Sequence, residues 1–282
     1  MKRDTIFLVL ICVGMFFFAS FALWPEEIQQ ATVGVTYHGI HENETALPTE
    51  MTDISSRNFK LVRVPVCFQW NSDPDAMHLN CSERFLSEAR KHGLKTFVVC
   101  NVPLGQLEFD VVQTWKFVFR EYVSKFADKV DYWQIFNELD CMKKADGNYY
   151  MATELVQCFN VLATEIRNGD PTGKIVGVFS QIYMARIDLL NEIGKLDLDY
   201  AGLNVYEQGQ QFSTMQIDHL KAATGKPVII TELGTSEQDP QKKADWLTGQ
   251  VAFFKSRVPM VVLFDWKDSL YAIKPTDYSV SS

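Results

Sequence analysis

The feature that most constrains the fold of this chain is a regular alternation of short apolar runs with longer amphipathic segments, which continues from residue 33 to residue 266. The runs are rich in Val and Ile and are apolar almost throughout, which is typical of strands that are buried on both faces of a parallel sheet. We expect strands at 33–38, 60–66, 95–101, 130–136, 174–179, 199–206, 226–231 and 259–265.

The segments between these runs have the periodicity of amphipathic helices. One of them begins with Ser82 and stops at Gly93, residue types that commonly begin and end a helix. Another stops before Gly169-Asp170-Pro171, which cannot continue a helix. We expect helices near 50–57, 82–92, 109–127, 148–168, 182–194, 213–223 and 240–256.

Eight strands with seven helices between them predict an α/β protein of the (β/α)8 TIM-barrel type, formed as a single domain by residues 25–282. A doubly wound open sheet is the alternative. Such a sheet usually has fewer strands and a glycine-rich first turn, and the pattern GxGxxG is absent here. An eighth helix is not clearly indicated, because Lys274-Pro275 interrupts the short segment after Trp266.

Residues 1–24 have the pattern of an export segment, either a signal peptide or a signal anchor. A basic start, Met1-Lys2-Arg3, precedes an uncharged apolar run over residues 5–24. Small residues around Ala22 favour cleavage by a signal peptidase, but a run of this length is also enough to remain as a membrane anchor. Both interpretations predict a secreted or membrane-anchored protein with residues 25–282 outside the cytosol.

The composition excludes some classes of partner and site. Lys and Arg number 27 and Asp and Glu 35, which gives a net charge of −8 without any long basic run. Binding to phosphates needs a basic surface, so we expect no nucleic-acid partner. Six Cys occur without a CxxC pair, which argues against a zinc knuckle or a thioredoxin-like motif. A Cys67–Cys81 disulfide and buried free thiols are both open alternatives.

Two glutamates follow strands that we expect to face each other. The active sites of such barrels lie at the carboxyl ends of the strands. Asn137-Glu138 follows the fourth expected strand and Glu232 follows the seventh, so both carboxylates should project into one cleft. Cleavage of a glycosidic bond uses such a pair, because a protonated carboxyl donates to the leaving oxygen while an ionised one attacks the anomeric carbon or activates water.

This arrangement resembles the clan A retaining glycoside hydrolases, which include cellulases, mannanases, xylanases and β-glycosidases. Asn137-Glu138 at strand four and Glu232 in VIITELG at strand seven carry the resemblance, which extends over most of residues 33–266. It implies a retaining glycosidase that cleaves β-linked poly- or oligosaccharides, with Glu138 as acid/base and Glu232 as nucleophile. Asn137 would contact the sugar hydroxyl next to the reacting carbon.

Three further positions match the same superfamily. The resemblance implies that Arg63 in LVRVP supports the nucleophile and that Tyr206 in GLNVY hydrogen-bonds it. It also implies that Trp266 in LFDW forms the aromatic floor of the −1 sugar subsite. From their positions after strands one and two, His38 and Trp70 are additional candidates for sugar contacts.

Other positions depart from the pattern of the superfamily. Leu139-Asp140 stands where many members have Pro after the acid/base, Asn204 where many have His, and Asn101 where some have His. These departures leave both carboxylates in place, but they prevent assignment to one family and therefore to one sugar.

Other hydrolase classes lack their motifs in this chain. Only five His occur, without HxH or HExxH, so we expect neither a metal nor another cofactor. The pattern GxSxG is also absent.

The alternative function is that of a non-catalytic carbohydrate-binding barrel tethered at the cell surface. A surface-anchored adhesion protein is a third possible function. Carbohydrate is the expected partner, residues 5–24 would provide any membrane tether, and the sequence does not indicate the oligomeric state.

Overall fold

The computed structural model describes residues 31–39, 45–67, 77–101, 107, 109–180, 186–267, 271–274 and 278–280. The chain divides into two units, Met1–Gln30 and Ala31–Ser282, and all described residues belong to the second. The expected signal peptide or anchor therefore lies outside the described residues. Within them, no helix combines the length and the apolar character needed to cross a membrane.

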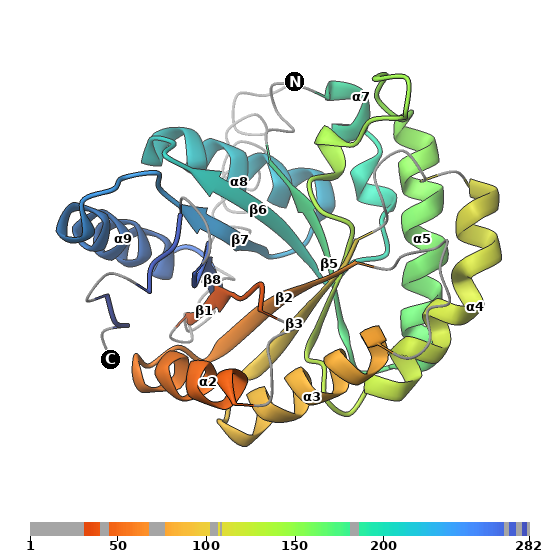
Figure 1. The fold of residues 1–282 in the computed structure, drawn as a ribbon. Helices are drawn as coiled ribbons and strands as arrows, with labels where there is room; N and C mark the ends of the chain where they lie inside the picture. Colours follow the sequence, from red (N-terminus) through yellow and green to blue (C-terminus); the bar gives the residue numbers. More distant parts are fainter. Residues whose placement is uncertain are drawn as a thin grey trace, which may run out of the picture. The chain divides into compact units, whose positions relative to one another are not determined.

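Eight parallel strands close into a barrel (Figure 1). They are β1 (Thr32–Thr36), β2 (Leu61–Cys67), β3 (Lys95–Asn101), β4 (Tyr132–Ile135), β5 (Lys174–Phe179), β6 (Tyr200–Tyr206), β7 (Val228–Gly234) and β8 (Met260–Leu263). Each strand pairs with the next along the chain, and β8 pairs with β1, which closes the sheet. Every strand lies where an apolar run predicted one, and the expected (β/α)8 barrel is confirmed.

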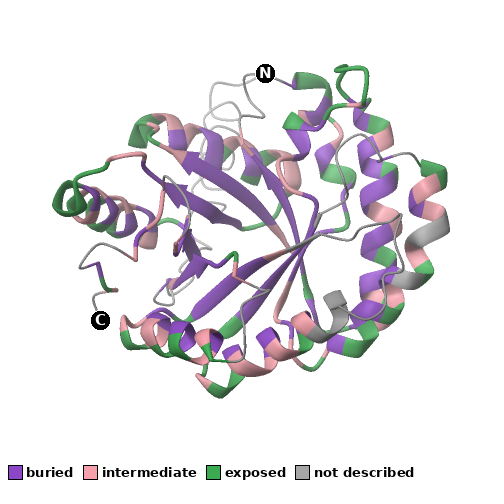
Figure 2. Ribbon diagram, viewed as in Figure 1, coloured by how far each residue is buried: buried purple, intermediate pink, exposed green. Residues whose placement is uncertain are grey.

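Helices alternate with the strands along the chain and lie outside the barrel (Figure 1). Those described are α2 (Ala46–Ser56), α3 (Met77–Lys91), α4 (Phe109–Phe126), α5 (Ala152–Gly169), α7 (Ile187–Leu190), α8 (Gln210–Thr224) and α9 (Pro240–Lys255), with 3₁₀ turns η1 (Leu139–Cys141) and η2 (Ile193–Lys195). The strands are buried and the outer sides of the helices are exposed (Figure 2), as expected for amphipathic helices that cover a parallel sheet.

The prediction of one helix over residues 182–194 is wrong. In its described part, residues 186–194, this segment contains only the single turn α7 and the start of the 3₁₀ turn η2. Asn191 and Gly194 have low helix propensities. Gly194 also lies so close to α8 that a Cβ there would be 2.8 Å from the carbonyl oxygen of Ala223. Close packing against α8 and weak propensity together account for the short helical turns.

Side chains that alternate along the strands fill the barrel interior. Near the amino ends of the strands this interior is apolar, with one buried cluster formed by Leu61, Phe97, Val176, Val178, Ile229, Met260 and Val262. Because side chains two residues apart share a face of a strand, the next inward residue after Leu61 is Arg63. By the same rule, Asn204 follows Gly202 on the inward face of β6. The apolar cluster therefore supports a polar layer toward the carboxyl ends of the strands.

Strand β7 is irregular at its middle. Leu203 pairs with Ile230 and Asn204 pairs with Glu232, so Thr231 is an extra residue on β7. A β-bulge of this kind changes the direction of side chains near it. As a result, both Thr231 and Glu232 reach inward, where they contact Asn204 and Arg63 respectively.

The cysteines whose side chains the structure describes are free thiols, namely Cys81, Cys100, Cys141 and Cys158. Because Cys81 is free, the Cys67–Cys81 disulfide is not formed, and the alternative of free thiols holds for these residues.

Candidate active site

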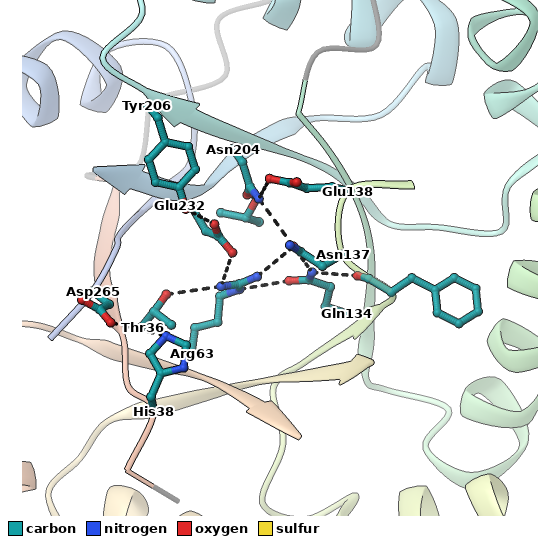
Figure 3. Close-up of polar contacts among 12 residues, drawn as sticks. Thr36, His38, Arg63, Gln134, Asn137, Glu138, Asn204, Tyr206, Glu232 and Asp265 are labelled. Carbon is teal, nitrogen blue, oxygen red and sulfur yellow. Dashed lines mark hydrogen bonds and ion pairs between the residues drawn. The ribbon is translucent and has the colours of Figure 1, made fainter. Parts of the chain in front are cut away.

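Polar side chains occupy the barrel interior at the carboxyl ends of the strands (Figure 3). Of the residues selected from the sequence, the structure brings Arg63, Asn137, Glu138, Tyr206 and Glu232 into one connected cluster. They come from β2, from the segment directly after β4, from β6 and from β7. This is the end of a TIM barrel at which catalytic residues are found.

Arg63 is the centre of this cluster. Its side chain is 3% exposed, and its Nη1 lies 2.8 Å from Oε1 of Glu232. Nε donates to Oε1 of Gln134 at 3.0 Å, and Nη2 donates to Oδ1 of Asn137 at 3.2 Å. Nη1 also donates to Oγ1 of Thr36 at 3.3 Å. A buried guanidinium needs such compensation for its lost hydration, and these partners fix its position as well as its charge.

Glu232 is held through both of its carboxylate oxygens. Oε1 faces Arg63, and Oε2 accepts a hydrogen bond from the hydroxyl of Tyr206. Burial raises the pKa of Tyr206 above its ordinary value, and the neighbouring charge of Glu232 raises it further. Tyr206 therefore remains a neutral donor at neutral pH, and Glu232 is aimed by a cation on one side and a hydroxyl on the other.

Glu138 lies in a different environment. Burial raises the pKa of its carboxyl group, and the nearby carboxylates of Glu232 and Asp140 add to this effect. A hydrogen bond of 2.9 Å from Nδ2 of Asn204 to Oε1 opposes the shift, as does the charge of Arg63, but the net pKa lies above the usual range of Glu. Glu138 thus retains a proton to higher pH than an exposed Glu does.

The backbone around Asn137 adopts an uncommon conformation. Phe136 and Glu138 have φ angles of 61° and 50°, in the left-handed region that residues other than Gly rarely adopt. Such residues are concentrated at functional sites, because the surrounding structure must stabilise them. Here they turn the chain sharply after β4, and the turn brings the side chains of Asn137 and Glu138 to the cluster.

The amide of Asn137 has a fixed orientation. Its Oδ1 accepts from Arg63 Nη2 at 3.2 Å, from Gln134 Nε2 at 3.0 Å and from Asn204 Nδ2 at 3.5 Å. Gln134 can only present its amide nitrogen here, because its oxygen already accepts from Arg63. The oxygen of Asn137 therefore faces the cluster, and its Nδ2 is turned away as a hydrogen-bond donor.

His38 lies beside the cluster at the junction of β1 and β8. Its side chain is 40% exposed, and its Nε2 is 3.4 Å from Oδ2 of buried Asp265. The ring also packs edge-on against Phe264. The structure therefore places His38 at an exposed position beside Asp265 (Figure 3). Trp70, the other candidate for sugar contacts, lies outside the described residues.

Trp266 differs from the expectation of an aromatic sugar floor. Its side chain is fully buried, and its Nε1 donates to Oε2 of Glu50 at 2.6 Å. One contact is an edge-to-face packing with Phe59, and the Arg57 guanidinium lies 5.1 Å from the centre of the ring system. Both the indole donor and the ring faces are thus engaged within the protein, so the described conformation offers no surface for a sugar to stack on.

Sequence reasoning did not select Gln134, Asn204 or Thr231 as site residues, although all three are buried and hydrogen-bonded in the polar layer. A signal was present for Gln134 and Asn204, because each is a polar residue within an otherwise apolar run, YWQIF and GLNVY, whereas Thr231 stands at the end of its run, directly before Glu232. A buried polar side chain requires a partner, so an isolated polar residue in such a strand indicates a polar interior. Across the described ranges, no group of three or more His, Cys, Asp or Glu could hold a metal ion.

Comparisons with known proteins give matches among solved structures only. No family model and no curated protein matches the chain. A family 1 β-glucosidase from Thermotoga maritima superimposes with a TM-score of 0.69 and 14% identity, covering 86% of this chain and 89% of the other.

Two mannose-related structures are similar to a comparable degree. A GH5_18 variant from Streptomyces cattleya, in complex with Manβ1-4GlcNAc, has a TM-score of 0.71 and 13% identity, covering 89% of this chain and 75% of the other. The exo-β-1,4-mannosidase Op5Man5 from Opitutaceae bacterium strain TAV5 has a TM-score of 0.69 and 14% identity, covering 84% of this chain but 52% of the other. The chain therefore has the fold of these glycosidase structures, which confirms the resemblance to clan A glycoside hydrolases at the level of the fold.

Proposed function

We propose that this protein is a retaining glycosidase that cleaves β-linked oligo- or polysaccharides, with Glu232 as nucleophile and Glu138 as acid/base. The observation that carries the proposal is the contrast between two neighbouring carboxyl groups. Glu232 faces a buried arginine and a hydroxyl donor, whereas burial raises the pKa of Glu138. Pairs of titratable groups in such opposite environments divide the acid and base roles between them.

The first step forms a glycosyl ester. A carboxylate oxygen of Glu232 attacks the anomeric carbon, and the bond from that carbon to the leaving oxygen breaks while Glu138 transfers its proton to this oxygen. Arg63 and Tyr206 hold Glu232 in place for the attack, so the nucleophile needs little reorientation.

The second step releases the sugar. Glu138, now ionised, removes a proton from water, and the resulting hydroxide attacks the anomeric carbon as the bond to Glu232 breaks. Two inversions at the same carbon give net retention. The proposal also predicts a separation of about 5–5.5 Å between the two carboxyl groups, as in other retaining enzymes.

Residues around the carboxylates would orient the sugar. Asn137 has its Nδ2 turned away from the cluster, so it would donate to an accepting oxygen at the position next to the anomeric carbon. His38, with Asp265 behind it, would contact sugar hydroxyls from the side of β1 and β8. Trp70 remains a predicted contact.

We further propose that residues 1–24 direct the barrel out of the cytosol, as their basic start and apolar run indicate.

The test is turnover of β-glucan, mannan, xylan, galactan and activated aryl β-glycosides by purified protein, compared with variants in which the carboxylates are removed. Glu232→Ala should lose turnover, and azide should restore cleavage of an activated glycoside with an inverted glycosyl azide as product. Glu138→Ala with azide should give the retained product, since Glu232 still forms the ester.

The carboxylate Glu83, which lies on α3 outside the site, provides the control through Glu83→Gln. Wild-type activity in Glu232→Ala would refute the assignment of the nucleophile. Binding of a polysaccharide without cleavage, unaffected by either carboxylate substitution, would instead favour the carbohydrate-binding barrel.

A further inference from the structure

Asn204 connects the acid/base to strand β7. Its Nδ2 donates to Oε1 of Glu138 at 2.9 Å and lies 3.5 Å from Oδ1 of Asn137. On the other side, its Oδ1 accepts a hydrogen bond of 2.8 Å from Oγ1 of Thr231. Asn204 and Thr231 are both fully buried, so the hydrogen bond between them is protected from competition with water.

The surroundings allow one orientation of the Asn204 amide. The side that faces Glu138 and Asn137 presents two acceptor oxygens, so the amide nitrogen must lie there. Thr231 supplies the donor that the amide oxygen needs on the opposite side. A flipped amide would place its oxygen against the oxygens of Glu138 and Asn137, and both sides of the contact would lose a hydrogen bond.

Thr231 reaches Asn204 because of the β7 bulge. It is the extra residue between the pairs Leu203↔Ile230 and Asn204↔Glu232. Regular alternation would direct Thr231 and Glu232 to opposite faces of the strand. The bulge brings both inward, so one short segment supports the two carboxylates of the site: Glu232 directly, and Glu138 through Thr231 and Asn204.

We propose that Thr231 and Asn204 form a positioning pair that fixes Glu138 for proton transfer to the leaving group. This inference rests on the proposed function, in which Glu138 is the acid/base. Neither residue is itself a proton donor or acceptor in the reaction. Glu232 is held by a separate set of partners, Arg63 and Tyr206, so loss of the pair affects acid catalysis more than nucleophilic attack.

The dependence on the leaving group distinguishes positioning from general support of the fold. Departure of a 2,4-dinitrophenolate needs almost no protonation, whereas departure of an alkoxide or an unactivated phenolate does, and general acid catalysis typically contributes about 10²–10⁴-fold. For Asn204→Ala we expect kcat/KM on poor leaving groups to fall at least about tenfold more than on 2,4-dinitrophenyl glycosides. The alkaline limb of the pH profile of kcat/KM should also move to higher pH. The hydrogen bond from Asn204 lowers the pKa of Glu138, so its loss in the variant raises that pKa.

Thr231→Val provides a second variant of nearly the same shape. It keeps the Asn204 side chain but removes the hydroxyl that orients it, so the same changes should appear in smaller size. In the Asn204→Ala background, Thr231→Val should change the leaving-group dependence no further, because the two act as one unit. Thr96→Val is the matched control: Thr96 is a fully buried Thr on β3 whose hydroxyl donates to the Lys129 carbonyl, away from the site.

The experiment compares kcat/KM of the full chain and these variants on aryl and alkyl β-glycosides, with circular dichroism to verify folding. Equal losses on good and poor leaving groups in Thr231→Val and Asn204→Ala, with an unmoved alkaline limb, would overturn the inference while the proposed function stands. No turnover of any β-glycoside by the wild-type protein would overturn the proposed function, and the inference with it.

Discussion

The buried ion pair between Arg63 and Glu232 makes a prediction about stability that does not depend on the enzymatic activity. In Arg63→Met the guanidinium is replaced by an unbranched, shorter and apolar side chain. The Glu232 carboxylate, 7% exposed, then keeps Tyr206 as its donor but loses its counter-ion. Gln134 also loses the donor to its buried amide oxygen.

The expected loss of stability is large. Removal of one partner from a buried ion pair costs about 3–5 kcal/mol, because the remaining charge stays desolvated. For a chain of this size, each kcal/mol lowers the melting temperature by about 2–4 °C, so Arg63→Met should lower it by roughly 6–20 °C. Glu232→Gln should cost less, since a neutral amide oxygen can still accept from Arg63. The double variant should cost less than the sum of the two, by about 1 kcal/mol or more.

The assay is urea denaturation at pH 7, followed by circular dichroism, with melting temperatures as a second measure. Lys91→Met is the matched control, because Lys91 lies 2.8 Å from Glu88, the same distance as in the buried pair, but its side chain is 69% exposed. An exposed pair contributes about 0–1 kcal/mol. If Arg63→Met and Lys91→Met lower the free energy of unfolding equally, the reasoning is refuted. Burial would then not determine how much the Arg63–Glu232 contact contributes to stability.

Three further predictions concern single groups. Because burial raises the pKa of Glu138, the alkaline limb of kcat/KM should lie above the usual titration range of Glu, and activity should fall as Glu138 loses its proton; a limb near pH 4 would contradict this. Tyr206→Phe removes a donor from Glu232 and should lower kcat by about 10²-fold, measured on an aryl glycoside; an unchanged kcat would contradict the role given to the hydroxyl. Trp266→Phe loses the hydrogen bond to Glu50 and should destabilise the protein by about 1–3 kcal/mol without raising KM; a raised KM would restore Trp266 as a sugar contact.

The barrel was predictable because its strands are buried on both faces, so that apolar runs mark each strand directly. The positions of Glu138 and Glu232 followed from the rule that parallel strands end at one side of the barrel. The length of β7 did not follow, because Glu232 is a charged residue and ended the apolar run at Thr231. The ion pair with Arg63, which is distant in sequence, offsets the loss of hydration when Glu232 is buried.

The role of Trp266 was not predictable from its position after β8. A tryptophan there can face the site or the protein interior, and the choice depends on which polar group satisfies its indole nitrogen. Glu50 on α2 is that group, and nothing in the sequence near Trp266 indicates it. The bulge at Thr231 was hidden for a similar reason, since the register between β6 and β7 is a property of two strands together.

The placement of Arg63 near both glutamates has a consequence for the electrical balance of the barrel interior during turnover. Before reaction, with Glu138 protonated, the charges of Arg63 and Glu232 cancel. In the proposed mechanism, Glu138 transfers its proton to the leaving oxygen as Glu232 becomes an ester. The repulsive effect of Glu232 on Glu138 then disappears while the attraction of Arg63 remains, which stabilises the ionised form of Glu138. In the proposed mechanism one positive charge thus neutralises each carboxylate in turn, and the buried cluster has the same net charge in the free enzyme and in the covalent intermediate.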